Sequence, residues 1–122
     1  MHVTSYDAIA PFVTKDGSEI REWAGPQPAS APALQQSLAE ATIPPGGATT
    51  EHYHRVTEEL YLVTAGTGLL TIDGEERTVA AGDCALIPPG AVHRIAATGD
   101  VPLRLVCACA PPYSDADTFL TG

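Results

Sequence analysis

The chain has 122 residues, of which 44% are hydrophobic, and its formal net charge is −9. This length fits one domain, residues 1–122, and the apolar content excludes a disordered acidic chain. The 6 basic residues are scattered along the sequence, so no cationic stripe is available to bind nucleic acid or an anionic membrane surface.

The first segment of the chain is predicted to form a hairpin. Residues 1–12 lack a basic end followed by a long apolar run, so we expect no signal peptide. No stretch of the chain is apolar for long enough to span a membrane. Asp16-Gly17 could form the turn of a hairpin between residues 10–14 and 18–23.

The next segment is ambiguous. Residues 25–32 are rich in proline and are expected to form a loop. In residues 34–43, Leu34, Leu38 and Ala41 are spaced along one face of a helix, and most of the other residues favour helices. Taken alone, residues 34–43 therefore predict a helix.

From residue 48 onward, Gly and Pro turn signals at short intervals separate segments typical of strands. Asp73-Gly74 is the strongest of these signals, because it suits a two-residue hairpin turn. The predicted strands are residues 48–54, 59–64, 69–72, 76–80, 84–87, 91–97 and 101–110. Many short strands predict an all-β fold, either an antiparallel barrel or a two-sheet sandwich. Residues 111–122 are predicted to be an irregular tail.

The three cysteines, Cys84, Cys107 and Cys109, indicate a reducing compartment. Their odd number and their spacing do not match a disulfide framework, so we expect free thiols and a cytoplasmic protein. Cys107 and Cys109 would share one face of a strand about 6.6 Å apart, near the upper limit for a disulfide. They are expected to fill the core, with a chemical role as the alternative.

A cluster of potential metal ligands lies in residues 52–59. His52 and His54 are two residues apart on a predicted strand, so both side chains point to the same face, about 6.6 Å apart at the backbone. This spacing suits two imidazoles that bind one zinc or iron ion. Glu58 and Glu59 are neighbours on a strand, so only one of them can face the same interior. His93, on another strand, could supply a further nitrogen. Each signal alone is more often a feature of a solvent-exposed surface.

Together, these residues resemble two motifs of the cupin family. The first motif is Gly, five residues, His-x-His, three or four residues, Glu, six residues, Gly. It is matched by Gly46, His52, His54, Glu59 and Gly66, and the gap before Gly66 selects Glu59 over Glu58. The second motif is Gly, five residues, Pro-x-Gly, two residues, His, three residues, Asn. It is matched by Gly82, Pro88, Gly90 and His93, with Ala97 in place of the final Asn.

The resemblance implies a double-stranded β-helix, which is a jelly-roll barrel, with its core over about residues 34–110. It also implies a strand in place of the helix predicted for residues 34–43. One divalent transition metal ion (Fe, Mn, Ni, Co, Cu or Zn) would be held by His52, His54, Glu59 and His93. The absent Asn affects the surroundings of the ligands rather than the ligand set.

Strand alternation then predicts the other residues of the interior. Tyr61 and Val63 would face inward with Glu59, while Leu60 and Leu62 would face outward. On later strands the predicted inward residues are Ile95, Ala97, Leu103, Leu105, Cys107 and Cys109. Tyr61 is either a core residue or a hydroxyl donor to a substrate.

The resemblance implies a metal-dependent enzyme that acts on a small oxygen-rich organic molecule, with Glu59 as a candidate base. Oxidative cleavage by a dioxygenase is the leading expectation, and an isomerase, cyclase or lyase is the alternative. A non-catalytic cupin that binds a small ligand is a further alternative. We expect a homodimer. Tyr113 and Phe119 in the tail could pack on the barrel or on a partner subunit, unless the tail frays.

Overall fold

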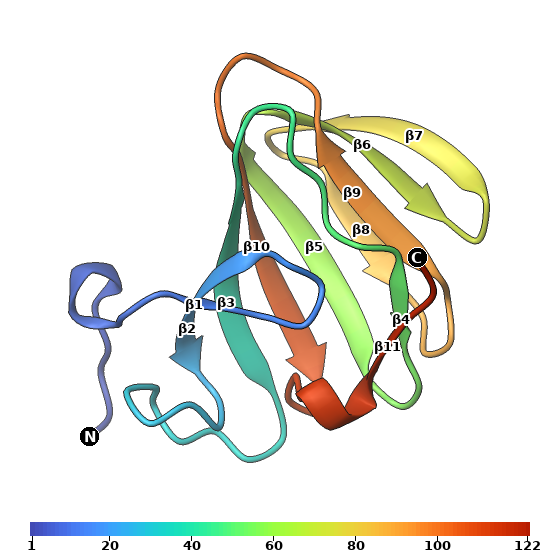
Figure 1. The fold of residues 1–122 in the computed structure, drawn as a ribbon. Coiled ribbons are helices and arrows are strands. Elements are labelled where there is room, and N and C mark those ends of the chain that lie inside the picture. Colours follow the sequence, from blue (N-terminus) through green and yellow to red (C-terminus); the bar gives the residue numbers. More distant parts are fainter.

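The computed structural model describes residues 1–122 and consists almost entirely of antiparallel strands in two sheets (Figure 1). The first sheet has the order β1-β2-β3-β10-β5-β8, and the second has the order β11-β4-β9-β6-β7. The strands are β1 (Phe12–Val13), β2 (Glu19–Ala24), β3 (Ser37–Ile43), β4 (His52–His54), β5 (Glu58–Ala65), β6 (Thr67–Ile72), β7 (Glu75–Ala80), β8 (Cys84–Ile87), β9 (His93–Ala97), β10 (Leu103–Ala110) and β11 (Thr118–Leu120). Two short 3₁₀ helices are η1 (Tyr6–Ala8) and η2 (Asp115–Asp117).

The two sheets face each other and enclose one hydrophobic core. In Figure 1, β3, β10 and β5 lie on one side of the barrel, and β9, β6 and β7 lie on the other. The core draws residues from both sheets, because buried and exposed residues alternate along the central strands. As predicted, Tyr61 and Val63 are buried while Leu60 and Leu62 are exposed. The other predicted inward residues are also buried: Ile95, Ala97, Leu103, Leu105, Cys107 and Cys109.

The turns that join the strands use the motif glycines. Gly66 links β5 to β6 with a φ of +78°, a conformation that residues with a side chain rarely adopt. A Cβ at this position would also lie 2.5 Å from the carbonyl oxygen of Pro102. Glycine is therefore required here, both for the backbone angle and for the close approach of the neighbouring loop.

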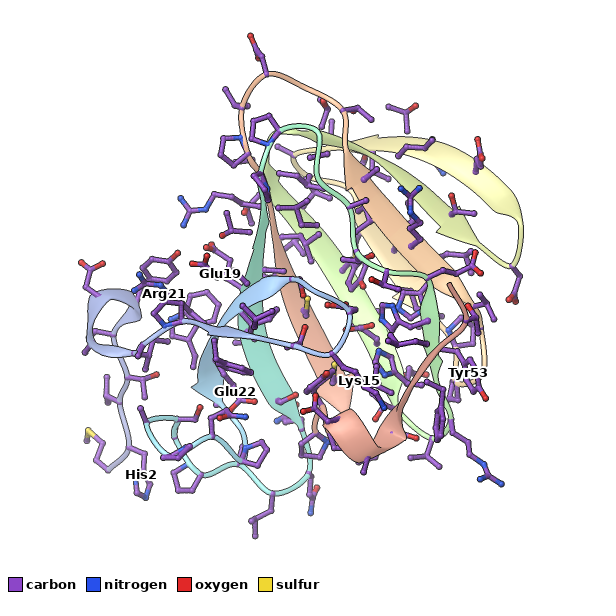
Figure 2. All side chains as sticks on the ribbon, in the orientation of Figure 1. His2, Lys15, Glu19, Arg21, Glu22 and Tyr53 are labelled. Atoms are coloured by element: carbon purple, nitrogen blue, oxygen red, sulfur yellow. The ribbon has the colours of Figure 1, made fainter.

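The N-terminal hairpin lies against the C-terminal segment at one end of the barrel. The Asp16-Gly17 turn joins β1 to β2, as predicted. Lys15 on this turn extends its Nζ to the carbonyl oxygen of Thr118, 2.7 Å away. Figure 2 shows Lys15 beside the C-terminal segment, whereas Tyr53 lies on the other side of β4. The N-terminal hairpin and the C-terminal segment are therefore in direct contact.

Three predictions from local sequence need correction. Residues 34–43 contain the strand β3, as the family resemblance implied, and the predicted helix is wrong. Pairing on both edges, with β2 and β10, outweighs the weak helical preference of these residues. The predicted strand at residues 48–54 is regular only at His52–His54, with an isolated bridge at Ala48. The tail is also more regular than predicted, because residues 111–122 contain η2 and β11. No helix in the structure has the length and apolar character needed to cross a membrane.

Candidate metal centre

Three histidines converge in the interior of the barrel. His52 and His54 project from β4, and His93 projects from β9, where it is the direct strand partner of His52. All three are at least 96% buried. Each offers one ring nitrogen to a cluster in which these atoms lie within 4.8 Å of one another. Nitrogens that bind one ion at about 2.0–2.1 Å each lie at most about 4.2 Å apart, so the cluster is close to the spacing that a shared ion requires.

The other ring nitrogen of each histidine fixes which nitrogen faces the cluster. His52 Nδ1 lies 2.7 Å from the carbonyl oxygen of Thr50, and His93 Nδ1 lies 3.0 Å from that of Ala91. A carbonyl only accepts hydrogen bonds, so both Nδ1 atoms carry a hydrogen. The two Nε2 atoms are therefore free to donate a lone pair to an ion, which is the arrangement that metal-binding histidines require.

The tautomer of His54 is fixed in the same way, by a residue of the C-terminal segment. Its Nδ1 lies 3.2 Å from the hydroxyl oxygen of Thr118. That hydroxyl donates its single hydrogen to the carbonyl oxygen of Ser114, 2.8 Å away. It must therefore accept from His54. All three histidines thus present Nε2 to the cluster.

Glu59 approaches the histidines from the opposite sheet. Its Oε1 lies 3.3 Å from His54 Nε2 and 3.4 Å from His93 Nε2. Glu59 Oε1 and His93 Nε2 are both fully buried, and neither has a hydrogen-bond partner. Buried polar atoms without partners are costly, and lone pairs that face each other repel unless a cation lies between them. The neighbouring Glu58 is exposed, as the motif spacing predicted.

Cys109 holds the second oxygen of this carboxylate. Its thiol donates to Glu59 Oε2 at 3.3 Å, and burial raises the pKa of the thiol, so it remains protonated. The cysteines were predicted to be core residues with a chemical role as the alternative. Cys107 belongs to the hydrophobic core, and Cys109 additionally orients Glu59. All three cysteines are free, as expected.

The pKa shifts of Glu59, His52 and His54 also favour a cation at this site. Burial alone raises the pKa of Glu59, but the imidazoles of His54 and His93 outweigh burial and lower this pKa to about 2. Burial lowers the pKa of His52, and the nearby charge of His93 lowers it further. For His54 burial acts in the same direction, but Glu59 outweighs it and raises the pKa. Glu59 therefore stays ionised beside the histidines, and its negative charge favours a cation next to it.

A cavity of about 40 Å³ adjoins the site. Its wall is mainly apolar, and Tyr61, His54 and Glu59 form part of the lining. The Tyr61 ring lies 6.0 Å from the His93 ring, centroid to centroid. Burial raises the pKa of Tyr61 well above its ordinary value, so its hydroxyl stays protonated.

Sequence reasoning missed three residues around the site. Thr118 was placed in an irregular tail, and Asp16 was treated only as part of a turn, although its carboxylate is buried beside His52. The contact of Cys109 with Glu59 follows from the register of β10 against β5, in which the two residues are direct partners. Strand alternation predicted that Cys109 and Glu59 both face inward, but it did not predict that they are partners across the two strands. No local signal in the sequence pointed to Thr118 or Asp16.

The four residues selected from the sequence, His52, His54, Glu59 and His93, are thus brought together from three strands of both sheets. The chemistry of this donor set fits a divalent transition metal ion, because neutral imidazole and carboxylate are ligands that such ions accept. The two buried atoms without partners, Glu59 Oε1 and His93 Nε2, face the point that an ion would occupy.

Two known proteins match most of this chain. The chain is 46% identical over 115 residues to the uncharacterized protein MJ1618 of Methanocaldococcus jannaschii, covering 94% of this chain and 90% of that protein. It is 33% identical over 109 residues to protein SchB of Streptomyces halstedii, covering 89% and 77% of the two chains.

Solved structures share the fold at lower identity. A variant of Streptomyces PAC13 with uridine has a TM-score of 0.79 at 14% identity, covering 100% of this chain and 92% of that chain. PAC13 is a nucleoside dehydratase. A sugar phosphate isomerase of the cupin superfamily from Silicibacter pomeroyi has a TM-score of 0.73 at 23% identity, covering 87% and 73%. Residues 39–109 match the cupin domain family, a segment that contains all three histidines and Glu59. The chain therefore belongs to the cupin family.

Proposed function

We propose that this chain is a metal-dependent enzyme that acts on a small oxygen-rich organic molecule. One observation carries the proposal: Glu59 Oε1 and His93 Nε2 are buried without partners and face each other at 3.4 Å. His52, His54, Glu59 and His93 would hold the ion. When bound, the ion would act as a Lewis acid that polarises a carbonyl or hydroxyl oxygen of the substrate.

The cavity supplies the remaining features of an active site. Its apolar wall, which includes Ile95 and Leu105, would exclude water from the carbon skeleton of a substrate. Tyr61 remains protonated and would donate a hydrogen bond to a substrate oxygen. Glu59 was a candidate base from the sequence. Because its pKa is lowered to about 2, we assign Glu59 to holding the ion instead of accepting a proton from the substrate.

Among reaction classes, we favour isomerisation, cyclisation or elimination over oxidative cleavage. The PAC13 structures are named for a nucleoside dehydratase, and a second structural relative is named a sugar phosphate isomerase. Both names describe reactions on polyhydroxylated molecules that consume no dioxygen. This order reverses the expectation from the sequence, which placed dioxygenase chemistry first.

Dioxygenase activity is retained as the second candidate because of one feature of the site. Two of the four proposed ligands, His54 and Glu59, line the cavity. Four protein ligands leave room for one or two further ligands on a five- or six-coordinate ion, which could be substrate oxygens or dioxygen.

A substrate screen with and without dioxygen tests the function. Protein purified without chelator would be loaded with Zn²⁺, Mn²⁺, Ni²⁺ or Fe²⁺ and incubated with sugar phosphates, nucleosides and hydroxylated aromatic compounds. We expect product in both atmospheres. Product only in air would select the dioxygenase, and saturable binding with no product in any arm would contradict an enzyme and indicate a ligand-binding cupin. Glu59→Gln should abolish turnover, and Glu58→Gln is the matched control because Glu58 is exposed.

We also propose that the protein is a cytoplasmic homodimer. The free thiols support a reducing compartment. The outer face of the first sheet carries a row of neighbouring residues, Leu38, Ala108, Leu60 and Leu86, which are partners across four strands. The three leucines of this row are between 40% and 54% exposed, and an apolar sheet face of this kind is a typical subunit interface.

A further inference from the structure

A second buried carboxylate lies beside the histidine cluster, on the N-terminal hairpin. Asp16 belongs to neither cupin motif, and it is 7% exposed although it sits in a turn. Three donors hold its Oδ1: the Thr14 hydroxyl at 2.7 Å, the Ser18 amide at 2.9 Å and the Ser18 hydroxyl at 2.6 Å. These contacts fix the orientation of the carboxylate.

The other oxygen of Asp16 faces the metal site. Asp16 Oδ2 lies 3.4 Å from His52 Nε2. Because His52 Nδ1 donates to the Thr50 carbonyl, neutral His52 has only a lone pair on Nε2. A carboxylate oxygen and a bare ring nitrogen repel each other at this distance unless a cation lies between them. The distance equals that between Glu59 Oε1 and His93 Nε2, which are also 3.4 Å apart.

The two carboxylates approach the histidine cluster from different directions. Glu59 lies next to His54 and His93, whereas Asp16 lies next to His52. Both carboxylates line the same cavity. A divalent ion with three neutral imidazoles and one carboxylate would keep a net charge of +1 in a buried site, and a second carboxylate would neutralise it. Because buried net charge is strongly unfavourable, two carboxylates suit a divalent ion better than one.

The hairpin is anchored firmly enough to present a ligand. The Asp16 carbonyl oxygen accepts a hydrogen bond from the Thr50 amide at 2.8 Å, which ties the turn to the segment just before β4. On the adjacent residue, Lys15 Nζ contacts the Thr118 carbonyl oxygen. The turn is therefore held between the two segments that position His52 and His54.

From these contacts we infer that Asp16 is a fifth protein ligand of the metal ion, bound through Oδ2 next to His52. The inference rests on the metal site proposed above, but not on the reaction. With five protein ligands, a six-coordinate ion would keep one position for a substrate oxygen, instead of the two that four ligands leave. It extends the site beyond the cupin domain match, which begins at residue 39. It also gives the N-terminal hairpin a role in metal binding.

Cobalt binding tests the inference without any assay of activity. Wild-type protein, Asp16→Asn and Glu22→Gln would be titrated with Co²⁺ while the visible absorption of the bound ion is recorded, and affinity would be measured by competition with a chelator. Asp16→Asn keeps an acceptor for Thr14 and Ser18 but removes the charge. Glu22→Gln is the matched control, because Glu22 is a buried carboxylate of the same cavity whose Oε2 is hydrogen-bonded to Gln27 and Ser30.

We expect Asp16→Asn to bind Co²⁺ at least about tenfold more weakly, in the range seen when groups around a metal site are removed. Its visible bands should also become stronger, because high-spin Co²⁺ absorbs more strongly as its coordination number falls. Glu22→Gln should match wild type. An Asp16→Asn protein with the unfolding temperature, Co²⁺ spectrum and affinity of wild type would overturn the inference.

A crystal structure of the wild-type protein with Co²⁺ provides a test that does not depend on the folding of a variant. An Asp16 Oδ2–ion distance of about 2.0–2.2 Å would support the inference, and a distance beyond about 3 Å would overturn it. Failure of the proposed metal site is distinguishable from failure of this inference. If wild-type protein binds no Co²⁺, both the metal site and the role of Asp16 are refuted. If wild-type protein binds Co²⁺ and Asp16→Asn binds it equally well, only the role of Asp16 is refuted.

Discussion

Thr118 Oγ1 lies 3.2 Å from His54 Nδ1, so a residue of the C-terminal segment orients a ring of the metal site. Thr118 is fully buried and pairs with His54 across β11 and β4. On the other side of the same strand pair, Phe119 stacks on Tyr53 with ring centroids 5.2 Å apart. The C-terminal segment is therefore part of the second sheet and of the surroundings of the site.

The first prediction concerns this contact. Thr118→Val keeps the shape of the side chain but removes the acceptor for His54 Nδ1, so His54 loses its fixed tautomer. Metal affinity should fall by about 10-fold to 100-fold, as is typical for groups that orient a metal-binding histidine. Isothermal titration with Zn²⁺ measures the change. Thr121→Val, which alters a Thr of the same segment whose hydroxyl is hydrogen-bonded to the Glu51 side chain, should bind like wild type. Equal affinities for the two variants would contradict the role of Thr118.

The second prediction concerns the thiol that contacts Glu59. Cys109→Ala removes the donor to Glu59 Oε2, so the carboxylate should become less well oriented and Zn²⁺ affinity should fall by about tenfold. Cys109→Ser retains a donor of similar size and should stay closer to wild type than Cys109→Ala. If Cys109→Ser and Cys109→Ala bind Zn²⁺ with the same affinity, Cys109 acts only by filling space.

How far the sequence predicts this site depends on whether the relevant residues lie in regular elements. His52, His54, Glu59 and His93 have fixed spacings within or next to strands, and alternation alone places Tyr61 and Leu105 inward. Residues 34–43 show the limit of local preference, because their helical spacing is overridden by pairing with strands on both sides.

Thr118 and Asp16 could not be found in this way, because their importance comes from contacts between distant segments. The contact of Thr118 with His54 spans 64 positions of the sequence. Asp16 lies in an Asp-Gly turn, which is normally a solvent-exposed feature, and its burial depends on the docking of the hairpin near Thr50. A turn signal predicts a change of chain direction but does not predict what the turn packs against.

The third prediction concerns acid stability. The half-buried Asp117 accepts hydrogen bonds through its carboxylate from the backbone amides of Arg55, Val56 and Thr57. Burial of Asp117 acts to raise its pKa, but these amides outweigh it and lower the pKa below 3.8. A lowered pKa in the folded state stabilises the fold above the unfolded-state value, and this contribution is lost as pH falls through the folded-state value.

Asp117→Asn should therefore have a lower free energy of unfolding than wild type near neutral pH, and the difference should shrink as the pH falls below 3.8 toward the folded-state pKa. Urea unfolding at a series of pH values measures this difference. Asp100→Asn, at an exposed acid in the β9–β10 loop, is the control and should follow wild type throughout. A difference between Asp117→Asn and wild type that is independent of pH would contradict the prediction.

The fourth prediction concerns the outer face of the first sheet. Leu60→Glu places a charge in the exposed apolar row, where it would be desolvated in an interface between two copies. Wild-type protein should sediment with the mass of two chains, and Leu60→Glu with the mass of one. Leu34→Glu, at an exposed leucine outside the strands, should remain a dimer. A wild-type mass of 12.7 kDa, that of a single chain, would refute the dimer.

Metal content is the most direct test of the central claim, that four buried groups from three strands bind one ion. Protein purified without chelator, dialysed against Zn²⁺ and then against metal-free buffer, would be analysed by mass spectrometry of the elements. We predict one ion per chain for wild type and for the control His2→Ala, whose His2 is exposed. We predict almost none for His54→Ala, His93→Ala and Glu59→Gln, provided that each variant is folded. A metal-free wild type, or full metal content in folded His54→Ala, would contradict the claim.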